Sequence, residues 1–174
     1  MSHDALSLLD IEARISTERL DLTPLRRDHA DELFTVLADP SLYECTEEVP
    51  PASPMDLRNR YARLETRQSP DGSEAWLNWI LSEISTGLSI GYVQATVTSR
   101  CTDIAWVVGR IWQRRGLATE AAQALVIWLR AAGVDDIRAM IHPCHTASQR
   151  VARNAGLSRT RKLIEGEEVW EYRL

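Results

Sequence analysis

The segment from Gln113 to Glu120 constrains the fold more than any other part of this chain. It follows an apolar run, residues 104–109, and leads into a long amphipathic stretch, residues 121–132. This order predicts a strand, a basic turn with one glycine, and a helix. Backbone N–H groups at a helix start lack partners within the helix, and the helix dipole favours negative charge there. The turn is therefore predicted to bind an anion, and its basic side chains favour phosphate or pyrophosphate.

The rest of the pattern predicts a single mixed domain, of α/β or α+β class, over residues 1–174. Residues 1–13 are predicted to form a short helix or a loose arm. Strands are predicted at residues 19–25, 76–84, 89–98, 102–108, 136–142, 157–164 and 167–172. Helices are predicted to follow Asp28 up to residue 38, and at residues 55–66, 121–132 and 146–155.

Composition narrows the classes of function. The formal net charge of −5 argues against a general nucleic-acid binder. No apolar run approaches the length of a membrane span, and the N-terminus lacks a signal-peptide pattern, so a cytoplasmic protein without membrane contact is expected. The cysteines Cys45, Cys101 and Cys144 lie far apart, which predicts three free thiols. No metal site is predicted.

Four features together resemble the GNAT family of N-acetyltransferases. Residues 17–25 resemble the opening strand of the branch that acetylates ribosomal-protein N-termini. Gln113-x-x-Gly116-x-Ala118 is similar to the family's acetyl-CoA signature. Residues 147–157 resemble its second cofactor-contacting segment, and the order of elements agrees from residue 18 onward. The resemblance implies a mostly antiparallel central sheet flanked by helices, with splayed strands at the site of acetyl-CoA, the acetyl donor.

The resemblance also implies which residues bind acetyl-CoA. Gly116 allows the backbone to approach pyrophosphate closely, and Arg114 and Arg115 add charge-assisted hydrogen bonds. The strand before the motif is implied to bind pantetheine through its backbone, with Gly109 marking a bulge. The implied cofactor-binding residues are Trp106, Val107, Val108, Gln113, Arg114, Arg115, Gly116, Leu117, Ala118, Thr119, His145 and Ser148.

Family members transfer the acetyl group directly, so no cysteine needs a catalytic role. The reaction needs a base for the amine and a proton donor for the leaving thiolate. His145 stands where the family often has asparagine, and Ala152 stands where some members have a tyrosine acid. Ser148 is the candidate donor to the sulfur, or else a residue capping the helix. His145 is a candidate base, a cofactor contact or a helix cap.

Carboxylates are the alternative bases. Glu83 and Asp103 lie on strands where related enzymes place acidic groups, although each could equally be a solvated strand residue. The acidic residues Glu44, Glu47 and Glu48 lie in a loop that could face the acceptor amine and attract its charge, or else form a plain surface loop.

The function expected from these features is acetyl transfer from acetyl-CoA to a primary amine of a small molecule or of a protein N-terminus, by a monomer or a homodimer. Two alternatives stay open. The missing tyrosine and the open choice of base allow a non-catalytic acyl-CoA-binding or sensor module. The acyl group could also be longer than acetyl, because the sequence does not give the width of the cleft.

Overall fold

In the computed structural model, which describes residue 10, residues 12–46 and residues 48–172, the chain forms one α/β domain. These residues build an eight-stranded sheet in the order β1-β2-β3-β4-β5-β6-β8-β7. Adjacent strands run antiparallel except β5 and β6, which are parallel. The strands are β1 (Ile15–Ser16), β2 (Leu20–Pro24), β3 (Ala75–Glu83), β4 (Ser89–Val97), β5 (Thr102–Val108), β6 (Ile137–Ile141), β7 (Leu157–Ile164) and β8 (Glu167–Tyr172).

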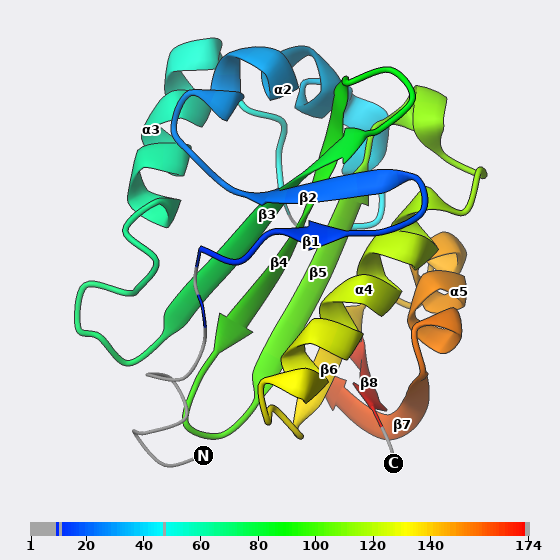
Figure 1. Cartoon of the computed structure of the whole chain (residues 1–174). Coiled ribbons are helices and arrows are strands. Elements are labelled where there is room, and N and C mark those ends of the chain that lie inside the picture. The colour runs from blue at the N-terminus through cyan, green and yellow to red at the C-terminus, as the bar shows by residue number, and fades with distance from the viewer. Residues whose placement is uncertain (1–9, 11, 47, 173–174) are drawn as a thin grey trace.

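Helices cover both faces of the sheet (Figure 1). The α-helices of the described chain are α2 (His29–Leu37), α3 (Pro54–Leu64), α4 (Leu117–Ala131) and α5 (Thr146–Asn154), and the short 3-10 helices are η1 (Pro40–Leu42) and η2 (Arg110–Trp112). Helices α2 and α3 share a core with one face, and α4 and α5 share a larger core with the other. Side chains alternate along a strand, so neighbours such as Trp79 and Ile80 of β3 enter opposite cores.

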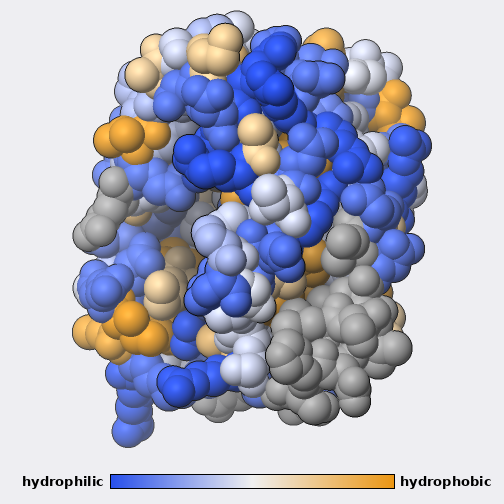
Figure 2. Space-filling view, turned by 90° about the vertical axis from the view of Figure 1, so that its left-hand side faces the viewer, coloured by the Kyte–Doolittle hydropathy of each residue, from blue (hydrophilic) through white to orange (hydrophobic). Residues whose placement is uncertain are grey.

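The surface is more hydrophilic than these cores. The face turned to the viewer in Figure 2 is mostly hydrophilic, with hydrophobic residues in small separate groups. Within the described residues, none of the helices combines the length and the apolar character needed to cross a bilayer.

The predicted fold class is confirmed, and three strands, β5, β7 and β8, have the predicted bounds. Two local features differ from the prediction. Strand β1 was not predicted, because two residues are too few to give an alternating pattern. Helix α4 begins at Leu117, one turn before the amphipathic stretch that predicted it. The short helix or arm expected over residues 1–13 lies largely outside the described residues.

The prediction of three free thiols is wrong. Cys45 and Cys144 form a disulfide, and Cys101 is free. The two bonded cysteines are 99 residues apart in the sequence. Cys45 follows η1, and Cys144 lies in the loop between β6 and α5, so the fold brings together two loops whose separation in the sequence gives no sign of their contact.

Candidate functional site

A cleft of about 600 Å³ lies between β5 and β6. In this sheet the two strands pair at two positions, Thr102 with Ile137 and Asp103 with Arg138. The strands then separate, and residues 104–108 and 139–141 line the cleft from its two sides. The predicted splay is therefore confirmed. The edge of β5 that faces β6 keeps backbone groups that no neighbouring strand uses, and such groups need partners.

The turn at the end of the cleft has free donors. Gly116 precedes α4 with φ at 81°, and no side chain caps the helix. The first hydrogen bond within α4 runs from Glu120 N to Gly116 O, at 3.0 Å. The N–H groups of Leu117, Ala118 and Thr119 therefore have no acceptor in the helix, and all three residues line the cleft with Gly116. This arrangement fits a bound pyrophosphate.

The two arginines of the motif take different positions. Arg114 is exposed and lines the cleft, with a positive φ of 62°. Arg115 instead donates to the carboxylate of Glu83, away from the cleft lining. Arg150 of α5 also lines the cleft and was missed by sequence reasoning, since arginines on an exposed helix face are common. Arg114 and Arg150 thus bring positive charge to the lining of the cleft.

Residues behind the turn hold it in place. Arg19 donates through Nε to Glu120, at 2.7 Å, and through a terminal nitrogen to the carbonyl of Arg115, at 2.9 Å. Thr17 donates to the same Glu120 carboxylate, at 2.6 Å. Burial alone would raise the pKa of Glu120, but the hydrogen bonds from Thr17 and Arg19 hold it below its ordinary value. The segment that resembled the family's opening strand therefore supports the turn without entering the cleft.

The end of β5 also differs in detail from the prediction. Trp106, Val107 and Val108 line the cleft as expected. The side chain of Gln113 lines it too, and its amide donates to the carbonyl of Val108, at 3.1 Å. The expected bulge at Gly109 is not found, because β4 and β5 pair without a shift through Val108, and Gly109 is the N-cap of η2.

His145 and Ser148 meet at the start of α5, and both line the cleft. The backbone N–H of Ser148 donates to Nδ1 of His145, at 3.4 Å, so the imidazole caps the helix. Nδ1 therefore carries no proton, and the neutral ring has its proton on Nε2. Burial lowers the pKa of His145, and the nearby His142 lowers it further. The geometry thus favours a neutral cap that can donate through Nε2.

The lowered pKa of His145 predicts a pH effect on stability. The unfolded chain keeps a histidine pKa near 6.5 and binds the proton more readily than the folded chain does. The free energy of unfolding should therefore decrease as pH falls below about 6.5. An NMR titration of His145 should give a pKa below 6.5. In the control variant His145→Asn, which keeps a capping side chain that does not titrate, this loss should shrink; an unchanged loss would contradict the assignment.

The two carboxylate candidates for the base are placed outside the cleft lining. Burial alone would raise the pKa of Glu83, but hydrogen bonds from Thr86 and Arg115 hold it below its ordinary value. Asp103 accepts two hydrogen bonds from Arg138, at 2.6 and 3.0 Å. Ionised carboxylates held by arginines, away from the cleft, are poorly placed to take a proton from an acceptor. Their positions give no support to a role as the base.

The acidic loop does reach the cleft. Glu48 lines it, whereas Glu44 does not and Glu47 is outside the described residues. Tyr92 and Gln94 of β4 also line this part of the cleft, and sequence reasoning missed both. The sequence gives little sign of their role, because they alternate with the buried residues of β4 in the way that ordinary exposed strand residues do.

Comparisons with known proteins identify this fold. A family model described as the acetyltransferase (GNAT) domain matches residues 19–158. No curated protein sequence matches the chain. Its structure is similar to that of a GNAT-family acetyltransferase from Bacillus anthracis, with a TM-score of 0.73 and 19% identity over 92% of this chain and 96% of that one.

Two further solved structures contain the donor or its product. RimL, an α-N-acetyltransferase of a ribosomal protein, was solved with coenzyme A; its TM-score is 0.73 at 14% identity, over 92% of this chain and 96% of that one. The microcin immunity acetyltransferase MccE was solved with acetyl-CoA and AMP; its TM-score is 0.70 at 12% identity, over 91% and 94%. At these identities the likeness shows the fold. With the family model matching most of its length, the chain belongs to the GNAT family of acetyltransferases.

Proposed function

We propose that this protein transfers an acetyl group from acetyl-CoA to a primary amine, in a small molecule or at a protein N-terminus. The observation that carries the proposal is the uncapped start of α4, which follows Gly116 at the end of the cleft between β5 and β6. Free N–H groups at that position suit a pyrophosphate, and the unpaired edge of β5 suits the amide groups of pantetheine. The coenzyme A in the solved structure of RimL and the acetyl-CoA in that of MccE support acetyl-CoA as the ligand here.

Successive parts of the cleft would bind successive parts of acetyl-CoA. The N–H groups of residues 117–119, with Arg114 and Arg150, would hold the pyrophosphate. Residues 104–108 would align pantetheine along the open strand edge. The bound donor supplies an activated acetyl group as a thioester. The acceptor binds as an ammonium and first gives one proton to a base. The neutral nitrogen then takes the acetyl group as the carbon–sulfur bond breaks, and it loses a second proton while the sulfur gains one.

We assign roles in this exchange to three side chains of the cleft lining. Ser148 lies in the cleft and is the candidate donor to the sulfur. His145 offers its Nε2 proton as a donor, because Nδ1 is taken by the helix cap. Glu48 lies on the acceptor side, where its negative charge attracts a protonated amine. A base that acts directly or through water can then be Glu48, which replaces Glu83 and Asp103 in this proposal.

The proposal is tested by thiol release. Acetyl-CoA is incubated with the protein and a panel of amines, and free thiol is measured with a colorimetric reagent. Release that depends on both the amine and the protein supports transfer. Binding of acetyl-CoA without release over the whole panel would instead favour the non-catalytic acyl-CoA-binding module. A faster reaction with longer acyl-CoA donors would favour the longer acyl group.

The variant Ser148→Ala is expected to lower kcat about a hundredfold, at the lower end of what a positioned proton donor typically contributes. Its affinity for acetyl-CoA should change little, since the pyrophosphate donors lie on α4. Steady-state kinetics and calorimetric titration would measure the two quantities separately. The control is Thr146→Ala, on the same helix but outside the cleft lining. An unchanged kcat in Ser148→Ala would exclude this serine from proton transfer.

A further inference from the structure

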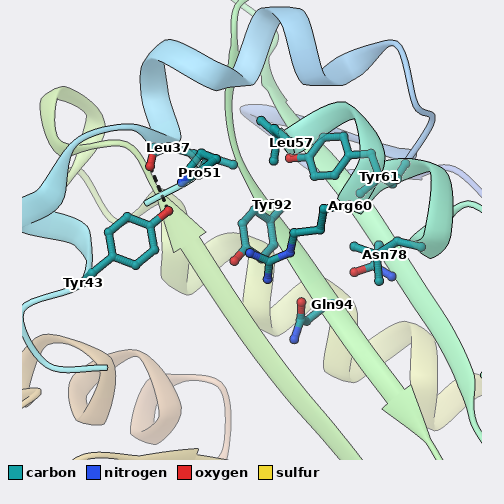
Figure 3. Close-up of a pocket in the computed structure, with 11 residues that line it drawn as sticks. Leu37, Tyr43, Pro51, Leu57, Arg60, Tyr61, Asn78, Tyr92 and Gln94 are labelled. Carbon is teal, nitrogen blue, oxygen red and sulfur yellow. Dashed lines mark hydrogen bonds between the residues drawn. The ribbon is translucent and has the colours of Figure 1, made fainter. Parts of the chain in front are cut away.

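A second, smaller cavity of about 10 Å³ lies between the layer of α2 and α3 and the sheet (Figure 3). Tyr92 and Gln94 of β4 line both this cavity and the cleft, so the two spaces meet at these side chains. The cavity holds about one water-sized group, so a single polar atom of a ligand fits inside it while the rest of the ligand stays in the cleft. Under the proposed function, this position belongs to the acceptor.

Tyr61 gives this cavity an unused donor. Its side chain is only 2% exposed, and its hydroxyl has no hydrogen-bond partner among the described residues. The hydroxyl of Tyr43, which also lines the cavity, donates to the carbonyl of Leu37 at 2.8 Å. Burial raises the pKa of Tyr61, so its hydroxyl keeps its proton. Buried polar groups in native proteins are nearly always satisfied, so this hydroxyl is expected to bond to a water, an ion or a ligand group that enters the cavity.

Arg60 brings a positive charge to the same place. In Figure 3 its side chain extends from α3 across Tyr92. Arg60 forms a loose ion pair with Glu48, with 3.5 Å between the two charged groups. The buried amide of Asn78 and the amide of Gln94 add polar groups that both donate and accept hydrogen bonds. The guanidinium of Arg60 and the unused hydroxyl of Tyr61 can both donate to an anion such as a carboxylate.

Glu48 supplies the opposite charge on the cleft side. Its side chain is half-exposed and lines the cleft, whereas Arg60 lines the small cavity. A ligand that carries both an ammonium and a carboxylate could exchange this one loose ion pair for two closer ones. A polyamine would leave Arg60 without a new partner. A protein N-terminus has a peptide group where the carboxylate would be.

We propose that the acceptor is a small zwitterionic amino acid, whose carboxylate binds Arg60 and the hydroxyl of Tyr61 while its amine faces Glu48 in the cleft. This inference rests on the proposed acetyl transfer. It makes Arg60 the residue that selects substrates with a free carboxylate. The amine then lies at the junction of the two cavities, on the side from which Ser148 and His145 are reached through the cleft.

The test compares matched acceptors that differ only in the carboxylate. Glycine, alanine and serine are each assayed beside their C-terminal amides by thiol release from acetyl-CoA. The free acids should exceed their amides at least tenfold in kcat/KM. In Arg60→Met this ratio should fall to about one. In Arg63→Met, an exposed arginine on the same helix, the ratio should persist. Tyr61→Phe removes only the hydroxyl and should lower the ratio several-fold.

Calorimetric binding of the same amino acids to the protein with coenzyme A gives a readout that does not need turnover. Binding that requires Arg60 supports the subsite even if no thiol is released, and only the acetyl-transfer proposal then fails. Equal rates for acids and amides would overturn the subsite while transfer stands. So would faster reaction with a serine-initiated peptide. The subsite also fails if Arg60→Met keeps acetyl-CoA binding and the ratio, or if no amino acid binds or reacts.

Discussion

Replacing Gly116 with valine is expected to weaken acetyl-CoA binding at least a hundredfold. Gly116 has φ at 81°, a backbone conformation that a β-branched residue adopts only with strain. An added Cβ would lie 3.5 Å from Arg19, so the space itself is tolerable. The cost comes from the backbone, which must shift to relieve the strain and so misdirects the N–H groups of residues 117–119. Calorimetric titration measures the loss of affinity, and each tenfold increase in Kd corresponds to about 1.4 kcal/mol of binding free energy.

The matched control lies at the other end of the same helix. Gly133 follows α4, also has φ at 81°, and has open space where a Cβ would be added. Gly133→Val should therefore lose stability to a similar extent but keep its affinity for acetyl-CoA. If both variants lose affinity equally, general destabilisation explains the result. If Gly116→Val binds normally, pyrophosphate binds elsewhere.

Replacing Gly91 with alanine should destabilise the fold by about 3 kcal/mol, at the upper end of the cost of overpacking. The added Cβ would lie 2.0 Å from the carbonyl oxygen of Val107, a backbone atom that cannot move without moving β5. In an ordinary strand interior, alanine stabilises relative to glycine, so the expected sign is the reverse of the usual one. For a chain of this size the melting temperature should fall by roughly 6 to 12 °C.

Thr96→Val is the matched control for Gly91→Ala. It places a residue of nearly the same shape on β4, five positions further on, where strand geometry favours valine. Its melting temperature should stay within about 2 °C of the parent value. A Gly91→Ala variant as stable as the parent would show that β5 can yield at Val107.

Much of the fold follows from local pattern. Leu20 and Leu22 alternate with polar residues and form the buried side of β2. Gly133, with its positive φ, follows α4 where the periodic pattern stops. The donor end of the site could be located in the same way, because the turn at Gly116 needs only a strand, a glycine and a helix start.

What could not be predicted depends on contacts between distant segments. Nothing near Arg115 in the sequence indicates that it binds Glu83 and leaves the cleft to Arg114. The disulfide and the cavity at Tyr61 arise in the same way, from segments that meet only in the folded chain. His145 could be predicted in part. The sequence indicates that it precedes a helix, but it does not indicate that Nδ1 accepts from the backbone of Ser148.

The short pairing between β5 and β6 has a mechanical consequence. The sheet amounts to two antiparallel units, β1 to β5 and β6 to β8, hinged at two residue pairs. The second of these pairs is Asp103 with Arg138, and the ion pair between their side chains adds a further link between the two units. A molecule that forms hydrogen bonds with the open edge of β5 and also contacts β6 links the two strands where they do not pair with each other. A molecule bound there is therefore expected to stiffen the connection between the two units, and its release to loosen it again.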